Sequence, residues 1–408
     1  MNGFANPNGK KSQRTIALEL RDPRSSFESN TATWQTFNQS VALGIDWLNN
    51  SKDWRAKTWA RAGLFVGGLW SNAMLRFYSH EVAHEYVYRS NNIRIHNALD
   101  FRSWKNSYIP ALYYPSWKQS TVDPNLLNED ELISATVAGL NQDELNAETA
   151  WQSSFERESI SFYDAQSYLL TKLRDVEYIA KSGSDEAPFA AGQKIHQLQY
   201  DVYAVTPHLF DDVNLYRLAL LNNNVDISNQ QLMNRALFAD MMSWFTWESV
   251  WSLFSYLKSG ENSSRLFSFQ LAENVQLVPP LFSHYMTTSG SFFNSSYVLL
   301  VNDKKYQIDI GSMIGFTRIE AFRHYRFGLK ALDIELQRFW HISPYVYANG
   351  RSGLNIDGYS VGFINIVPFS QNLAATVKFE YNKNDIVKNL VKRERKGLQT
   401  VFGVRIEF

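Results

Sequence analysis

The sequence predicts an α+β protein in which a mainly helical portion, residues 1–260, precedes an antiparallel β portion, residues 261–408. Two observations support this prediction. Up to about residue 259, apolar residues recur at helical spacing in several long segments, whereas beyond Gly260 apolar and polar residues alternate over stretches of about ten residues. The length of 408 residues is sufficient for two domains.

Two short stretches near the N-terminus alternate between apolar and polar residues. They cover residues 16–20 and residues 41–47. A period of two is typical of a half-buried strand, so we expect two short strands ahead of the first long helix.

The first long helix is expected from about Asp53 to Arg89, because apolar residues there cover most of the helix circumference. This segment contains the sequence His-Glu-x-x-His, where x is any residue. Residues four apart lie on one face of a helix, so His80 and His84 can direct two imidazole nitrogens to one metal ion. Glu81 would then reach towards a metal-bound water.

A sharp helix break is expected near residue 140. Gly139 suits the end of one helix, Asn141 suits the N-cap of the next, and Glu144 stands three residues later as a capping-box partner. The new helix would present Glu144 and Glu148 on one face, one turn apart. These two carboxylates are candidates to complete a metal site.

An aromatic stripe occupies the last expected helix before the β portion. Its members are Trp244, Trp247, Trp251 and Phe254. Aromatic residues at helical spacing are typical of core packing, and contact with a membrane interface is the alternative.

Charge and cysteine content restrict the compartment and the partners. Basic and acidic residues balance at 40 each, so the charge gives no indication of nucleic acid. The chain has no Cys, which excludes thiolate zinc sites and suits an oxidising compartment such as the bacterial periplasm. The start, Met1 to Lys11, lacks an apolar signal core and is expected to be a mature N-terminus with an added Met.

The final strand gives a first resemblance. From Leu398 to Phe408, apolar residues alternate with Gln399, Gly403, Arg405 and Glu407, among others. This amphipathic strand resembles the last strand of bacterial outer-membrane β-barrels. The resemblance implies that the β portion is a membrane β-barrel in contact with outer-membrane lipid, and that the protein belongs to the bacterial cell envelope.

The helical motif gives a second resemblance, to the zincin metallopeptidases, and implies a Zn²⁺ cofactor with a third protein ligand. Ser90 stands where a metzincin has its third His, so that branch is excluded. The helix expected after Asn141 resembles the gluzincin element that supplies a Glu ligand. Family analogy makes Glu144 the ligand, whereas the capping box leaves Glu148 free for zinc. We favour Glu148 and keep Glu144 as the alternative.

The predicted function is therefore a zinc-dependent metallopeptidase that hydrolyses a peptide or protein substrate, with Glu81 as the general base. A Tyr, His or Arg is expected to stabilise the oxyanion, and His208 is one candidate. Two alternatives stay open. One is a non-enzymatic outer-membrane β-barrel, a channel or assembly factor with a structural His-Glu-x-x-His, and the other is a soluble zincin with a β-sandwich binding domain.

Overall fold

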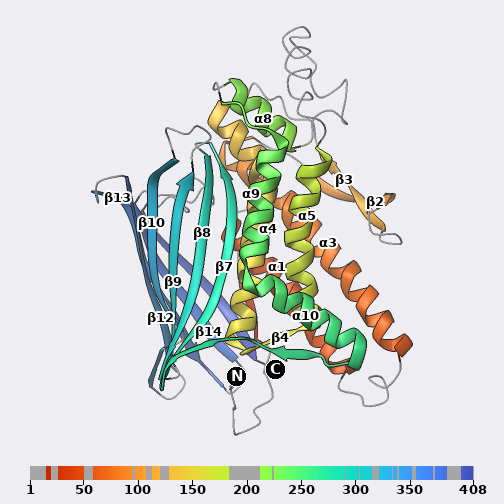
Figure 1. The fold of residues 1–408 in the computed structure, drawn as a ribbon, viewed down its shortest axis with the longest axis vertical. Coiled ribbons are helices and arrows are strands. Elements are labelled where there is room, and N and C mark those ends of the chain that lie inside the picture. The colour runs from red at the N-terminus through yellow and green to blue at the C-terminus, as the bar shows by residue number, and fades with distance from the viewer. Residues whose placement is uncertain are drawn as a thin grey trace.

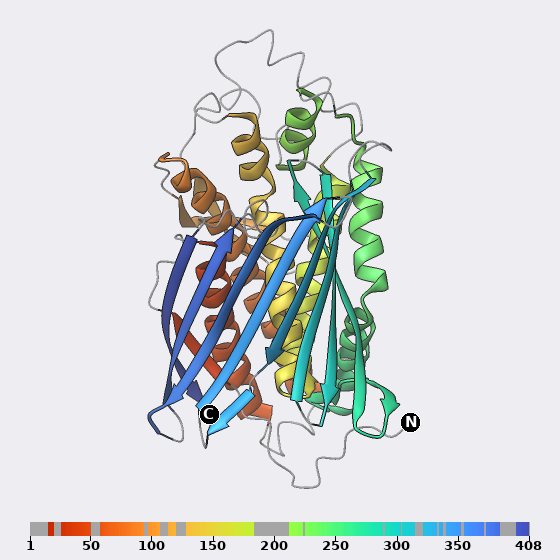
Figure 2. The same cartoon turned by 90° about the vertical axis from the view of Figure 1, so that its left-hand side faces the viewer.

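The computed structural model has seven helices and a large antiparallel sheet among the residues it describes. Figures 1 and 2 show the helices on the concave side of the curved sheet. The prediction of an α+β fold with helices ahead of an antiparallel meander is confirmed. The described residues are 15–19, 26–49, 58–93, 97–106, 113–119, 128–182, 212–222, 225–288, 290–302, 304–314, 321–332, 334–337, 340–351, 355–370, 373–383 and 397–407.

The helices follow one another with few strands between them. They are α1 Phe27–Asn49, α3 Thr58–Ser90, α4 Glu129–Glu156, α5 Phe162–Lys181, α8 Asp212–Asn222, α9 Asn229–Met242 and α10 Trp244–Ser259. The four short strands among them are β1 Thr15–Glu19, β2 Asn97–Asn106, β3 Tyr113–Gln119 and β4 Ser159–Ser161. None of the described helices combines the length and the apolar character needed to cross a bilayer.

The two predicted N-terminal strands have different outcomes. Residues 16–20 largely form β1, which pairs with the last strand of the chain and thus joins the large sheet. The strand predicted at residues 41–47 is wrong, because these residues lie inside α1. Trp34, Asn38, Ala42 and Ile45 are buried at spacings of three and four residues, so tertiary packing selects the helical period.

The helix break predicted near residue 140 is also wrong, since α4 continues without interruption from Glu129 to Glu156. Its capping box lies a full three turns earlier. Asn128 is the N-cap, its side chain accepts from the Glu131 N–H, and the Glu131 carboxylate accepts from the Asn128 N–H. Gly139 therefore lies in the middle of a helix, which requires another reason for a glycine at this position.

Most strands of the β portion have 11–14 residues. The strands are β5 Ser263–Arg265, β6 Phe269–Ala272, β7 Val275–Thr287, β8 Gly290–Val301, β9 Lys304–Ile314, β10 Ala321–Leu332, β11 Ile334–Gln337, β12 Trp340–Arg351, β13 Asn355–Pro368, β14 Leu373–Lys383 and β15 Gly397–Glu407. Eleven strands form one sheet in the order β1-β15-β14-β13-β12-β10-β9-β8-β7-β6, with β11 beside β12. Its end strands are β1 and β6, which are not paired with each other, so in the described residues the sheet is open rather than closed into a barrel.

The two faces of this sheet have opposite character. On β14 the Phe379 side chain points outward and is 37% exposed, whereas the adjacent Glu380 points inward and is 2% exposed. Strands β9, β10, β12 and β13 repeat the pattern. Their exposed outward residues include Ile310, Phe327, Leu329, Val346, Tyr359 and Val361, and their buried inward residues include Gln307, Asp309, Arg326, Asn349 and Ser360. The apolar face of the sheet is thus the outer one.

A polar cavity of about 370 Å³ separates the inner face of the sheet from α1 and α4. Its lining includes Glu28 from α1, Glu148 from α4, and Arg326, Tyr345 and Glu380 from the sheet. On its other side α4 packs against α3 and α5. Helix α4 therefore has one polar side towards the sheet and a second towards the helices.

Candidate metal centre

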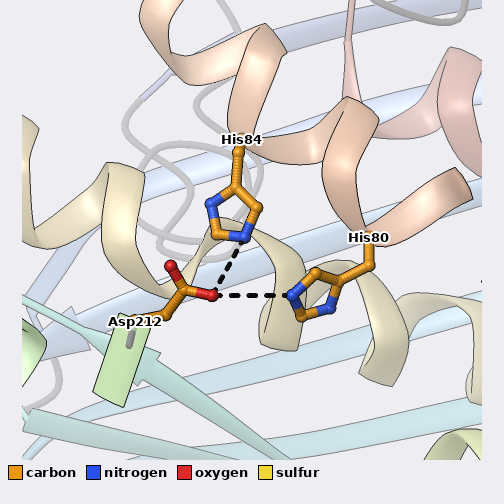
Figure 3. A group of neighbouring side chains, drawn as sticks. All are labelled: His80, His84 and Asp212. Atoms are coloured by element: carbon orange, nitrogen blue, oxygen red, sulfur yellow. Dashed lines mark ion pairs between the residues drawn. The ribbon is translucent and has the colours of Figure 1, made fainter. Parts of the chain in front are cut away.

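His80 and His84 lie one turn apart on α3, and both side chains are buried. The structure brings one further ligand to them, Asp212, the first residue of α8. Asp212 Oδ2 lies 3.7 Å from His80 Nε2 and 3.4 Å from His84 Nε2, and the three potential ligand atoms lie within 4.8 Å of one another (Figure 3). In the part of the chain that the structure describes, this is the group of acidic and imidazole side chains suited to a metal ion.

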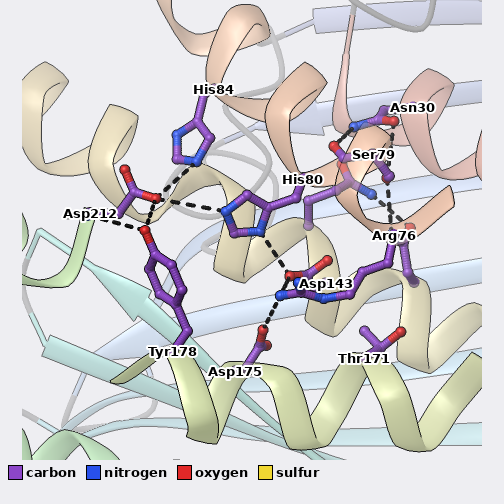
Figure 4. Close-up of polar contacts among 12 residues, drawn as sticks. Asn30, Arg76, Ser79, His80, His84, Asp143, Thr171, Asp175, Tyr178 and Asp212 are labelled. Atoms are coloured by element: carbon purple, nitrogen blue, oxygen red, sulfur yellow. Dashed lines mark hydrogen bonds and ion pairs between the residues drawn. The ribbon is translucent and has the colours of Figure 1, made fainter. Parts of the chain in front are cut away.

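The other imidazole nitrogens are engaged from α4. His84 Nδ1 lies 2.7 Å from the Ala135 carbonyl oxygen, which only accepts, so His84 Nδ1 donates. His80 Nδ1 lies 2.9 Å from Asp143 Oδ2 (Figure 4). Metal-binding imidazoles characteristically donate their second N–H to a carboxylate or a backbone carbonyl, as both do here. In the neutral histidines the Nε2 lone pairs then face Asp212, and His84 Nε2 is buried without a hydrogen bond. The arrangement fits a metal ion.

Gly139 is explained by this geometry. A Cβ atom at position 139 would lie 2.3 Å from His80 Nε2, well inside contact distance. The imidazole ring of His80 therefore occupies the space in which any other residue would place its side chain. This close approach, rather than a helix end, requires glycine at the centre of α4.

Charged groups around Asp143 hold the His80 ring in place. Asp143 Oδ2 accepts from both His80 and the Arg76 guanidinium, and Arg76 also pairs with Asp175 at 3.1 Å (Figure 4). Burial disfavours the Asp143 carboxylate, but Arg76 and His80 outweigh it and lower the pKa of Asp143. Asp143 is therefore an anion that fixes the orientation of the His80 imidazole.

The electrostatics of the site suit either two protons or one divalent cation. Burial disfavours the imidazolium form of His80, yet Asp143 and Asp212 outweigh it and raise the pKa of His80 to about 10. Burial and Asp212 likewise oppose each other at His84, whose pKa is also raised. The two histidines in turn overcome burial to lower the pKa of Asp212. Replacing two imidazolium protons by one divalent ion leaves the total charge unchanged, so the same carboxylates suit either occupant.

Asp212 is oriented by Tyr178 and is the most exposed of the three potential ligands. The Tyr178 hydroxyl donates to Asp212 Oδ2 at 3.0 Å, which orients the carboxylate. The Asp212 side chain is 28% exposed, whereas both imidazoles are 7% exposed. Access from solvent is therefore on the Asp212 side.

Glu144, the alternative third ligand, is occupied by another partner. Both of its carboxylate oxygens accept from the Lys172 ammonium group, at 2.9 and 2.6 Å. Asp240 lies on the same ammonium group at 3.1 Å. Glu144 is thus neither a capping residue nor a member of the group formed by the two histidines and Asp212.

Glu148, the favoured third ligand, lines the polar cavity towards the sheet. It is one turn beyond Glu144 on α4 and is not part of the histidine group. Glu81 is half-buried on α3, and its charge contributes to the raised pKa of His84. His208 and residues 1–11 lie outside the described residues.

Sequence reasoning found the two histidines and missed Asp212 and Asp143. Asp212 lies 128 positions after His84, and an acidic residue at a helix start is commonly explained by the helix dipole. Asp143 lies between Asn141 and Glu144, which were predicted to form a capping box at a helix start. The single local signal was Gly139, whose place in α4 marks the close approach of His80.

No protein-family model, curated protein or solved structure matches this chain significantly. The site is therefore interpreted from its own geometry.

Proposed function

We propose that the chain is a zinc-dependent hydrolase that uses His80, His84 and Asp212 as its metal ligands. The observation that supports it most is the convergence of two imidazole Nε2 atoms on Asp212 while Asp143 and the Ala135 carbonyl engage both Nδ1 atoms. Two histidines and one carboxylate leave a fourth position for water or substrate, as catalytic zinc sites do.

The chemistry assigned to the site is hydrolysis of a peptide bond. His80, His84 and Asp212 would hold the zinc ion, which would supply Lewis-acid activation of a water and of the substrate carbonyl. Glu81 is proposed to take the proton of the attacking water and to pass it to the leaving amine. Asp143 keeps His80 in the ligating tautomer, and Tyr178 keeps Asp212 oriented towards both histidines.

We also propose that the β portion faces lipid in the outer membrane of the bacterial envelope. The support is the inverted sheet, with apolar side chains such as Phe327 and Val346 exposed outward and charged side chains such as Arg326 buried inward. Alternation of this kind is typical of strands between lipid and a polar lumen. The proposed membrane barrel thus takes the form of a lipid-facing sheet filled by helices. The β-sandwich alternative lacks support, because β6 to β15 all belong to one sheet.

A second candidate function has a specific observation in its favour. With both imidazoles protonated, His80 Nδ1 can donate to Asp143 and His84 forms an ion pair with Asp212, so that both charges are balanced without a metal ion. The motif would then be a structural ionic cluster in a non-enzymatic envelope protein.

Metal analysis combined with a peptidase assay tests the proposal. The purified protein should contain one zinc ion per chain, and His80→Ala should abolish its retention. Glu81→Gln should keep the metal and lose peptide hydrolysis by about 10²–10⁴-fold. Glu144→Gln, outside the histidine group, is the matched control for Glu81→Gln. Purified protein without stoichiometric metal, and unable to bind added zinc, would support the structural cluster instead.

A further inference from the structure

The sheet has a long unpaired edge on β7. Strand β6 pairs only with Val275, Gln276 and Leu277, so in the described residues the remainder of β7 has no strand beside it on that side. Free N–H and C=O groups on a sheet edge promote association with other strands. In contact with lipid they are costlier still, because no water satisfies them.

Side chains from the helices satisfy this edge. Asn141 of α4 accepts from the Met286 N–H and donates to the Met286 carbonyl oxygen, both at 2.9 Å. The Ser243 hydroxyl oxygen, between α9 and α10, accepts from the Phe282 N–H at 2.9 Å. The Lys172 ammonium of α5 donates to the Phe282 carbonyl oxygen at 3.2 Å. At Phe282 and Met286 the helices thus satisfy backbone groups that a further strand would satisfy in a barrel.

Helix α10 lies beside this edge. Like the sheet, it has large apolar residues on its exposed face. It buries three small polar residues, Thr246, Ser249 and Ser252, together with the aromatic residues Phe245 and Tyr256. Those that it exposes are Trp244, Trp247, Val250, Trp251, Phe254 and Leu257, with Phe238, Met241 and Met242 exposed on α9. The prediction that the aromatic stripe packs in the core is therefore wrong. A surface helix in water exposes polar residues, whereas α10 exposes a face of large apolar residues and buries three small polar ones, as helices packed within a membrane do.

The apolar surface of the helices is continuous with that of the sheet. Phe238 of α9 meets Phe293, on the outer face of β8, with ring centres 6.3 Å apart. At the other end Trp244 packs against Phe267 at 5.2 Å, and Phe267 packs against Phe269 of β6 at 4.8 Å. Figures 1 and 2 both show α9 running alongside β7. Aromatic side chains therefore bridge the sheet edge without a polar gap at these two places.

We infer that α9 and α10 form a lipid-contacting wall that continues the outer face of the sheet past its β7 edge. This face contacts the hydrocarbon of a lipid bilayer, because both the helices and the sheet expose apolar side chains there. The inference rests on the membrane placement proposed above and adds that helices, rather than strands, complete this side of the lipid-facing perimeter.

Because the chain lacks Cys, single-cysteine variants of the full-length protein can report the surroundings of chosen positions. Trp251→Cys and Phe254→Cys test the wall, Phe379→Cys tests the sheet, and Gln230→Cys is an exposed polar control on α9. Each variant is labelled with an environment-sensitive fluorophore and reconstituted into phosphatidylethanolamine–phosphatidylglycerol vesicles. Circular dichroism confirms the fold of each variant. Lipid-borne nitroxide should remove most emission at positions 251, 254 and 379, and aqueous iodide should remove most at position 230.

Two results would overturn the inference. If iodide quenches positions 251 and 254 while nitroxide lipid quenches position 379, the helices face water although the sheet is in the membrane. If neither agent quenches positions 251 and 254, a protein surface such as a second copy covers the wall. Iodide quenching at all four positions would instead refute the membrane placement itself, and with it the wall.

Discussion

Two buried ionic groups lie against α4, and they differ in the origin of their positive charge. In the first, the Lys172 ammonium lies between the carboxylates of Glu144 and Asp240, so the chain supplies its own cation. In the second, His80, His84 and Asp212 direct two titratable nitrogens and a carboxylate towards one another. A lysine fills the first group permanently, whereas the second can exchange protons for a metal ion. Proximity of a buried Glu to the motif is therefore insufficient to make it a ligand.

The largest effect on stability is expected from Lys172→Met. Removal of the ammonium leaves two buried carboxylates uncompensated, which should lower the free energy of unfolding by about 3–5 kcal/mol. Zinc content per folded chain should stay unchanged. Denaturant unfolding and metal analysis measure the two effects, and adding Glu144→Gln should recover part of the stability. If Lys172→Met instead lost zinc and kept its stability, the Lys172 group would be part of the metal site.

The next effect concerns the third metal ligand. Asp212→Ala should reduce zinc affinity by more than about 100-fold, because losing a ligand exceeds the roughly 10–100-fold effect of losing a supporting group. Glu144→Gln and Glu148→Gln should leave affinity unchanged. Competition with a chromogenic chelator measures all three. Zinc release by Glu148→Gln with retention in Asp212→Ala would restore the original expectation from the sequence.

A smaller loss is expected from Asp143→Asn. The amide keeps the shape of the side chain but removes the anion that orients His80, so zinc affinity should fall by about 10–100-fold. Ser134→Ala on the same helix is the control, because the Ser134 hydroxyl donates to the Asp130 carbonyl oxygen and is not part of the histidine group. Equal affinities of the two variants would contradict the role assigned to Asp143.

The next prediction is a pH dependence of metal affinity, whose effect for a single pH unit lies at the lower end of the range expected for Asp143→Asn. The pKa of His80 is raised to about 10 in the metal-free protein, so this imidazole holds its proton throughout the neutral range. Metal must displace that proton, and each unit of pH lowers the competition. Zinc affinity should therefore rise by about tenfold per unit between pH 6 and 8, and more where His84 also releases a proton. Calorimetry in buffers of different ionisation enthalpy counts the protons, and a flat profile would contradict the raised pKa.

The metal-free protein should respond to pH in the opposite direction. A raised imidazole pKa stabilises the folded state below the pKa of the unfolded chain, and this contribution is lost as pH rises through the folded pKa. Unfolding of the chelator-treated protein should therefore become easier between pH 7 and 10 through His80. Zinc-loaded protein lacks this proton and should not show the same loss. Parallel melting curves of both forms provide the comparison.

The sequence alone determined the local patterns. Helical spacing predicted α3 and placed His80 and His84 on one face, and strict alternation predicted the strands beyond residue 260 with their single apolar face. These features depend on neighbours within one or two turns or along one strand. At these segments the packing of the chain agrees with the local pattern.

The tertiary structure decided everything that depends on distant neighbours. It converted residues 41–47 from an apparent strand into helix, since burial at Trp34, Asn38 and Ala42 follows a helical period. It placed Asp212, rather than Glu148, beside the histidines. Local rules predicted a helix end at Gly139 and Asn141. In the structure Gly139 makes room for the His80 ring, and Asn141 hydrogen-bonds to Met286 on the β7 edge. A local rule weighs one segment, whereas contacts between elements far apart in sequence outweigh the small free energies that favour a cap or a strand.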